Sequence, residues 1–392
     1  MQYTLTRSQV HRHAAHLLQT HLRLTDFRSR CPAQVLLDVL LAAAAWLTSL
    51  SAACLRLPRA PCPETARLAL RHWLPAQDEL ERRLNAALAD RLPRALRRRK
   101  QRLAADLTLV PYHGLPFADR AEVYRSKAKD GTSHFHAYAT IYLVLRGQRF
   151  TLALTPVAKG EHLEEVLQRL LRRCARLGVR PRILLLDRGF YSVGVVRYLQ
   201  AARYAFLMPL PLRGRTADHP DGPGGSNVFR YRARSGWDSY TLRSADGRTA
   251  TVSVCVKCRN WRGERGRHGR QRLVYAFWGF TPASWDWVRQ TYRSRFAIET
   301  SYRQLHQGRA RTSSRHPSVR LLLVGLALVL RNVWVWLHYA VLSTPRRGGR
   351  VLRLERLRLR TLLTWLLHVV LQRYDACDQI MAERPIGPGV GF

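Results

Sequence analysis

Hydrophobic positions recur at helical spacing through the first hundred residues. The recurrence covers residues 8–22, 33–57, 64–73 and 78–96, and prolines mark the breaks between these segments. The pattern predicts a helical N-terminal region. It ends in a basic run from Arg97 to Lys100, which fits either a solvated helix face or a contact with a polyanion.

The pattern changes after residue 102 to shorter, strand-like apolar segments. Strands are predicted over 103–110, 135–145, 148–156, 182–186 and 204–210, and helices over 161–177 and 192–202. The order is three strands, then helix, strand, helix and strand. Three antiparallel strands followed by parallel strands with crossover helices are typical of a ribonuclease-H-like core.

The rest of the chain divides into three further parts. Residues 211–226 are rich in proline, glycine and aspartate and are predicted to form a linker or loop. Residues 227–280 return to strand-like alternation, and one of the strand-like segments is 229–234. Helices are predicted over 283–309, 319–342 and 351–374. We therefore predict a mixed α/β (α+β) fold, a ribonuclease-H-like core with a β-rich insertion between flanking helical regions. The predicted regions are 1–100, 101–210 for the first part of the core, 211–282 for the insertion, 283–312 for a core helix, and 313–392.

Charge points to a polyanionic partner. Lysine and arginine number 66 against 26 acids, which gives a formal net charge of +40. Such an imbalance attracts nucleic acid first and an anionic membrane surface second. A GC-rich genome accounts for the preference of arginine over lysine, but it does not account for the shortage of acids.

Two apolar stretches, 39–55 and 321–342, test the membrane alternative. The first is rich in Ala, Ser and Thr, and the second is interrupted by Arg331 and Asn332. A central arginine is costly in a bilayer, so both are predicted to be buried helices and no membrane partner is expected. The seven cysteines form no even framework, and the lone pair Cys255 and Cys258 fits two structural strand residues better than a metal site. A reducing cytoplasm, with association to the nucleoid, is the expected location.

Two aspartates stand out in the predicted sheet. Asp106 interrupts an apolar strand, where a carboxylate costs desolvation energy unless a cation or hydrogen bonds compensate. Asp187 stands at the end of the strand 183–186, and the carboxyl ends of parallel strands are where α/β sheets place ligands. Either aspartate alone also fits a turn or a helix cap.

A third acid lies in the helix predicted over 283–309. Tyr292, Arg295 and Glu299 are spaced i, i+3 and i+7 and therefore share one helix face, which His306 extends by about two turns. The alternative is an ordinary Arg–Glu pair, four residues apart, on a solvated helix.

Three carboxylates without a Cys/His set favour Mg²⁺ or Mn²⁺ over Zn²⁺. Two such ions, about 4 Å apart, activate a nucleophile and stabilise the leaving oxygen in phosphodiester cleavage. In this hypothesis Asp106 bridges both ions, while Asp187 and Glu299 each hold one.

Together these motifs resemble the insertion-sequence transposases of the Asp-Asp-Glu class. The matching segments are Asp106 to Gly114, Asp130 to Thr140, Asp187 to Ser192 and Tyr292 to Arg303. Successive acids are 81 and 112 positions apart, with a β-rich segment in the second interval. More narrowly, the chain resembles the branch with a Tyr-x2-Arg-x3-Glu-x6-Lys signature, a β insertion and a DNA hairpin at the transposon end.

The resemblance implies metal-dependent cleavage at transposon ends and strand transfer into target DNA. It implies a homodimer on double-stranded terminal inverted repeats, with DNA binding or dimerisation in region 1–100. The implied DNA contacts are Tyr292, Arg295, Arg188 and, for a flipped base, Trp261 or Trp278. The chain departs from the signature at one position, where His306 replaces the lysine. A neutral histidine binds phosphate less well than lysine does, and Arg303 or Arg309 are the candidates to take over this role. The alternatives are a ribonuclease-H-like nuclease without strand transfer and a catalytically decayed, transposase-derived DNA-binding protein.

Overall fold

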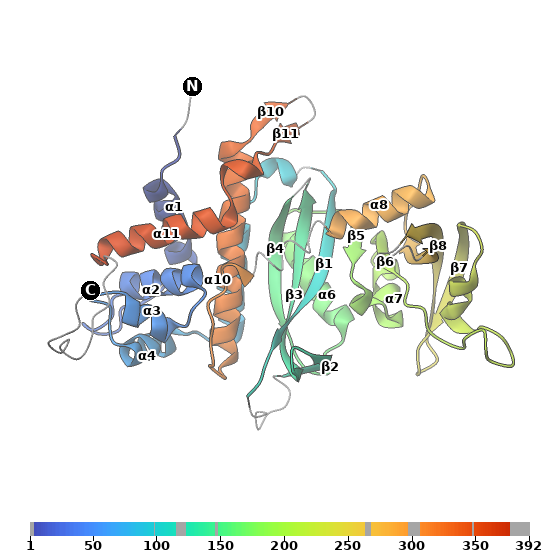
Figure 1. Cartoon of the computed structure of the whole chain (residues 1–392), viewed down its shortest axis with the longest axis horizontal. Helices are drawn as coiled ribbons and strands as arrows, with labels where there is room; N and C mark the ends of the chain where they lie inside the picture. The colour runs from blue at the N-terminus through green and yellow to red at the C-terminus, as the bar shows by residue number, and fades with distance from the viewer. Residues whose placement is uncertain are drawn as a thin grey trace. The chain divides into compact units, whose positions relative to one another are not determined.

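The computed structural model describes residues 4–97, 99–114, 123–145, 148–262, 268–296, 306–346 and 349–376. The chain divides into two compact units (Figure 1). The helical unit comprises Met1–Ala76, Leu305–Trp334 and Arg353–Phe392. The sheet unit comprises Gln77–Gln304 and Val335–Leu352. The boundaries of the five predicted regions stay a prediction.

The helical unit consists mainly of α-helices. Its main helices are α1 (Arg7–Leu22), α2 (Ala33–Trp46), α3 (Leu50–Arg56), α4 (Pro63–Trp73), most of α10 (Pro317–Trp336) and α11 (Leu359–Arg373). The α2 helix is buried from Leu36 to Ala45, and α11 packs against both α1 and α2. Thr6 begins α1 with a capping box in which its side chain accepts from the backbone of Gln9.

The helix predicted over 33–57 is in fact two helices, α2 and α3, which meet at 102°. Leu47 ends α2 in the left-handed conformation, with φ of 57°, and the Ser49 side chain then caps α3 by accepting from Ala52 N. In the described part of the chain, one helix, Pro317–Leu342, is long and apolar enough to cross a membrane; 94% of its most apolar window is buried inside the protein.

A single mixed sheet forms the centre of the sheet unit. Its strands are β1 (Gln101–Pro111), β2 (Tyr124–Lys129), β3 (Thr132–Leu145), β4 (Gln148–Val157), β5 (Pro181–Leu186), β6 (Phe206–Pro209), β7 (Gly236–Arg243), β8 (Thr249–Arg262) and β9 (His268–Trp278). The order is β2-β3-β1-β5-β6-β9-β8-β7, and β4 also pairs with β3. The pairs β1–β3 and β3–β4 are antiparallel, whereas β1–β5 and β5–β6 are parallel. The predicted core topology is thus confirmed, and the insertion strands extend the same sheet beyond β6.

Residues 103–106 of β1 and 183–186 of β5 are buried without interruption, which indicates that both faces of this part of the sheet are covered. The helix α8 (Trp285–Phe296) covers one face, where Val288 and Tyr292 pack with Ala104, Tyr142 and Leu185. The crossover helices α6 (Leu163–Arg176) and α7 (Val193–Ala201) cover the other (Figure 1). Asp106 and Asp187 follow Ala104 and Leu185 by two residues and therefore belong to the face of α8.

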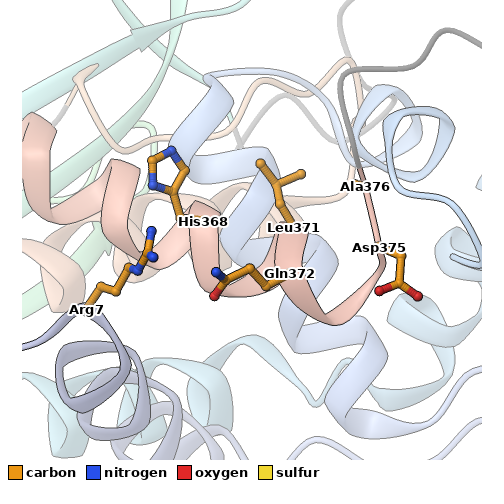
Figure 2. A pocket seen from close by; sticks show the side chains of 6 residues that line it. All are labelled: Arg7, His368, Leu371, Gln372, Asp375 and Ala376. Atoms are coloured by element: carbon orange, nitrogen blue, oxygen red, sulfur yellow. The ribbon is translucent and has the colours of Figure 1, made fainter.

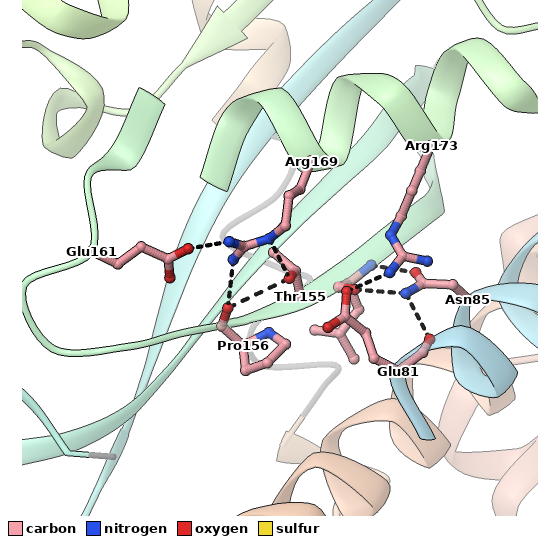
Figure 3. A network of polar contacts seen from close by, with 8 residues as sticks. Glu81, Asn85, Thr155, Pro156, Glu161, Arg169 and Arg173 are labelled. Carbon is pink, nitrogen blue, oxygen red and sulfur yellow. Dashed lines mark hydrogen bonds and ion pairs between the residues drawn. The ribbon is translucent and has the colours of Figure 1, made fainter. Parts of the chain in front are cut away.

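The helix α5 (Gln77–Asp90) packs against the strand β4 (Figure 3). Asn85 donates from Nδ2 to Leu154 O at 2.8 Å and accepts from Leu154 N at 2.7 Å, so its amide continues the ladder in place of another strand. Glu81 accepts from Arg173 of α6 at 2.6 Å. Burial raises the pKa of Glu81, and Arg173 opposes that rise.

Several predicted elements differ from the structure, and the helix expected over 351–374 begins only at Leu359. Residues 225–231 form a 3-10 helix, which takes up the first half of the strand expected over 229–234, and its buried Phe229 packs edge-on against Tyr240 of β7. The helix expected over 78–96 ends at Asp90. The helix α8 reaches Phe296, residues 297–305 lie outside the described part, and the chain turns directly after His306. The strand β2 and the hairpin of β10 (Thr344–Arg346) and β11 (Gly349–Val351) had no counterpart in the prediction.

Candidate active site

Asp106 lies on β1, in the centre of the sheet between β3 and β5. Its side chain is 6% exposed, and its Oδ1 accepts a hydrogen bond from Leu107 N at 2.9 Å. Ala104 and Ala105 beside it are fully buried. A carboxylate in such surroundings needs a nearby cation to remain charged.

Asp187 begins the short turn that follows β5. Its Oδ1 accepts from Arg188 N at 2.7 Å and caps the 3-10 helix Arg188–Phe190. The side chain of Asp187 is 36% exposed, so one side of the carboxylate faces solvent. The capping role that the sequence left open is therefore present, but it uses only part of the carboxylate.

The two aspartates converge on one cation, the guanidinium of Arg295. Because β1 and β5 run parallel with Ala105 opposite Leu186, the next residue of each strand lies at the same level. Arg295 Nη1 lies 3.4 Å from Asp106 Oδ2, and its Nη2 lies 3.1 Å from Asp187 Oδ1. Carboxylates from two adjacent strands thus share a single positive charge that is itself 7% exposed.

Arg295 is held in place by aromatic side chains. Its Cζ lies 5.2 Å from the centre of the Tyr292 ring, and that ring lies 5.3 Å from the ring of Tyr275 on β9. Burial acts to lower the pKa of Arg295, but Tyr292, Asp106 and Asp187 outweigh this effect and raise it above its usual value. Burial also raises the pKa of Tyr292, so its phenol stays protonated. Their helical spacing brings Tyr292 and Arg295 together on one side of α8.

A second arginine and tyrosine extend the site along the sheet, and neither was predicted. Arg149 on β4 is 4% exposed, and its Cζ lies 4.6 Å from the ring centre of fully buried Tyr142 on β3. Burial, together with Asp106, raises the pKa of Tyr142. This pair could not be recognised from the sequence, because Arg149 follows a predicted turn and looks like a surface residue.

The other predicted site residues have different placements. Glu299 and Arg303 lie outside the described residues. His306 is exposed and belongs to the helical unit, and Arg188 is exposed directly beside Asp187. Trp278 is half-buried at the end of β9, opposite Phe206 of β6, and the backbone of Trp261 pairs with Gly269. The roles assigned to all of them stay predictions.

A surface pocket of about 460 Å³ in the helical unit is a poor rival site (Figure 2). It is lined by Arg7, His368, Leu371, Gln372, Asp375 and Ala376. Its single carboxylate, Asp375, pairs with Arg59 at 2.9 Å on the surface. One exposed acid cannot supply the paired carboxylates that the chemistry needs.

The donor set around Arg295 fits a hard divalent cation. Asp106 Oδ2 and Asp187 Oδ1 are carboxylate oxygens that already face one shared cation. In the described part of the chain, by contrast, no three His, Cys, Asp or Glu residues gather in a group that could hold a metal, and Cys258 donates from Sγ to Arg232 O at 3.6 Å. The two aspartates would therefore need a further ligand from outside the described residues.

Comparison with known proteins agrees with this geometry. The family model of the transposase DDE domain matches residues 97–332, which is more than half of the chain. The fold is similar to that of piggyBac transposase, solved by cryo-electron microscopy as a synaptic complex with hairpin DNA. The TM-score is 0.52 at 10% identity, over 93% of this chain and 78% of that chain. No curated protein sequence matches the chain. The strand order is that of the ribonuclease-H-like fold, and the chain belongs to the family of DDE-domain transposases, the enzymes of DNA transposition.

Proposed function

We propose that the chain is a cut-and-paste transposase that hydrolyses phosphodiester bonds at transposon ends and joins the freed 3′ ends to target DNA. More narrowly, we assign it to the hairpin-forming group with the Tyr-Arg-Glu-Lys signature. The observation that carries the proposal is the convergence of Asp106 and Asp187 on one cation, at the level where parallel strands end. The family match supports it.

Asp106, Asp187 and Glu299 would hold two Mg²⁺ or Mn²⁺ ions in this proposal. Bound there, the ions would supply an activated nucleophile and charge stabilisation for the leaving 3′-oxygen. The protein positions the first two carboxylates through the parallel register of β1 and β5 and through the guanidinium of Arg295. The buried surroundings of Asp106 would exclude bulk water from one side of a phosphate bound there.

The DNA contacts follow from charge and exposure. Arg188 is exposed next to Asp187 and can reach a phosphate without leaving its turn. His306 stands in place of the signature lysine, with Arg303 or Arg309 as substitutes, and Trp261 or Trp278 would stack a flipped base. The partners would be terminal inverted repeats and target DNA, bound by a homodimer in the cytoplasm at the nucleoid.

Strand-transfer assays test the proposal. The purified chain is incubated with Mg²⁺, a supercoiled plasmid and a duplex taken from DNA that flanks the coding sequence. We expect joined products from the wild type and none from Asp187→Asn. Hydrolysis without joined products would instead identify a nuclease. DNA binding without cleavage or joining, equal in wild type and variant, would identify a DNA-binding derivative, and either result would overturn the proposal.

A further inference from the structure

Residues 210–231, which form most of the connection between β6 and β7, start at the same edge of the sheet as the candidate active site. The strands β5 and β6 run parallel with Leu185 opposite Leu207, so Asp187 and Pro209 lie at the same level. The chain leaves the sheet immediately afterwards, and Leu210 N still donates to Val274 O of β9 at 2.9 Å. Composition predicted a linker or loop here, and the structure shows that it begins at the sheet edge where Asp187 lies.

Two stretches of this loop, 211–215 and 224–227, are fastened to each other. Ser226 Oγ accepts from Arg213 N at 2.8 Å and donates to Pro211 O at 2.7 Å. Asn227 donates from N to Arg213 O at 3.1 Å and from Nδ2 to Gly214 O at 2.7 Å. Both side chains are buried, at 3% and 4% exposure. The backbone on both sides of Arg213 is therefore fixed.

Glycine is required where the two stretches meet. A Cβ on Gly214 would lie 2.3 Å from Gly224 O, and Gly214 has a φ of +112°. A Cβ on Gly225 would lie 2.8 Å from Arg213 O, and Gly225 has a φ of +62°. Any other residue at these two positions would be costly, because its Cβ would clash with the backbone and its φ would be strained. The glycine-rich composition thus reflects close backbone packing.

The fastened loop presents two exposed arginines. Arg213 has no acidic partner among the described residues, and Arg215 pairs with Asp221 at 3.3 Å, with side chains 48% and 67% exposed. Such an exposed pair is weak and exchanges readily. Arg213 also lies close enough to Tyr191 to oppose the rise in the pKa of Tyr191 that burial causes. Tyr191 N donates to Arg188 O at 3.2 Å and closes the turn that begins at Asp187.

We propose that residues 210–231 form a rigid phosphate-binding element that holds the DNA backbone beside the active site. Arg213 contacts one phosphate directly, and Arg215 exchanges Asp221 for a second. Both arginines bind phosphate oxygens, which are the same at every nucleotide, so we expect the contact to be independent of base sequence. The inference rests on the proposed function, since that function brings a DNA strand to Asp187. It adds a surface that the family match does not assign.

A charge-matched control exists at the opposite edge of the same sheet. Arg243 and Arg248 flank the turn between β7 and β8. Ser253 pairs with Phe277, and Trp278 pairs with Phe206 at the start of β6, so this turn lies at the far edge from Asp187. Arg243 is exposed, and Arg248 pairs with Asp246 at 2.7 Å, much as Arg215 pairs with Asp221. The double variants R213Q/R215Q and R243Q/R248Q therefore remove equal charge.

Fluorescence anisotropy of a labelled duplex, measured from 50 to 200 mM salt, tests the proposal. Each lost phosphate contact makes the slope of log K against log salt shallower by about 0.9. We expect R213Q/R215Q to flatten the slope by about 0.9–1.8, and R243Q/R248Q to leave it unchanged. Equal slopes in the two variants would overturn the proposal. Two duplexes are compared, one from DNA flanking the coding sequence and one of unrelated sequence, and an effect confined to either would also overturn it.

Loosening the loop while keeping both arginines provides an independent check. Ser226→Ala removes the hydrogen bonds that fix Arg213 N and Pro211 O. Gly225→Ala introduces a Cβ that clashes with Arg213 O and so disturbs the packing of the two stretches. We expect Ser226→Ala to weaken DNA binding several-fold with the slope retained, because the charges remain. Unaltered affinity in a folded Ser226→Ala protein would contradict a role for loop rigidity. A wild-type chain that bound neither duplex would refute the proposed function itself, which is a separate result from equal slopes.

Discussion

Arg295 Nη2 lies 3.1 Å from Asp187 Oδ1, although 108 residues separate the two in the chain. The same guanidinium reaches Asp106 at 3.4 Å, so one buried cation balances two acids from neighbouring strands. Removing one member of a buried ion pair leaves an uncompensated charge. The stability of the site and its chemistry therefore depend on the same group.

Arg295→Gln should lower the free energy of unfolding by about 2–3 kcal/mol, a figure reduced from that of a fully buried pair because Asp187 is partly exposed. Urea unfolding followed by circular dichroism measures it. Arg293→Gln is the matched control, because Arg293 lies on the same helix and is exposed. Equal stability of the two variants would show that the carboxylates do not depend on Arg295.

Asp106→Asn and Asp187→Asn should each reduce DNA cleavage by about a thousandfold or more, which corresponds to at least about 4 kcal/mol in activation free energy. The reason is that amide oxygens hold divalent cations far less well than carboxylates do. Single-turnover cleavage in Mg²⁺ measures the effect. Asp78→Asn, an exposed acid at the start of α5, should leave the rate unchanged. A variant of either site aspartate with wild-type rate would remove that residue from the active site.

Asn85→Ala should destabilise the sheet unit by about 2–4 kcal/mol, because Leu154 N and Leu154 O both lose their partner in a buried setting. Asn85→Asp keeps an acceptor for Leu154 N but no donor for Leu154 O, so it should not restore stability. Arg82→Ala, an exposed neighbour on α5, should change the midpoint of urea unfolding very little. If Asn85→Ala unfolded at the same urea concentration as Arg82→Ala, the amide would not serve as a substitute strand.

Hydrophobic periodicity was sufficient to predict the elements whose surroundings are uniform along their length. The core strands alternate or are apolar throughout, so their order could be predicted, and the parallel register then placed Asp106 and Asp187 at one level. Helical spacing likewise put Tyr292 and Arg295 on one side of α8. These features depend on local pattern and on general rules of sheet topology.

Features that depend on contacts between distant residues could not be predicted. Leucine rarely adopts the left-handed conformation that Leu47 has, so nothing in the sequence marks the break between α2 and α3. Arg149 reaches Tyr142 only through the hairpin of β3 and β4, whose register shifts at a bulge near Ile141. The loop 210–231 is ordered by Ser226 and Asn227, two polar residues that are common in any loop.

The helical unit should lose stability as the pH falls below neutrality, because of His11. This side chain is 1% exposed, and burial together with Arg373 lowers its pKa from 6.5 to about 4. The unfolded chain takes up a proton near pH 6.5 while the folded chain does not, so folding stability is full above that value and falls between pH 6.5 and 4. The loss reaches up to about 3 kcal/mol. Burial raises the pKa of Asp38, 3.9 Å from His11, and this acts in the opposite direction, since the folded state then binds the proton more readily.

His11→Gln retains Asp38 and Arg373, so the difference between its stability curve and that of the wild type isolates the histidine. Thermal unfolding from pH 7.5 to 4 measures both curves, and parallel curves would show that His11 titrates normally in the folded protein.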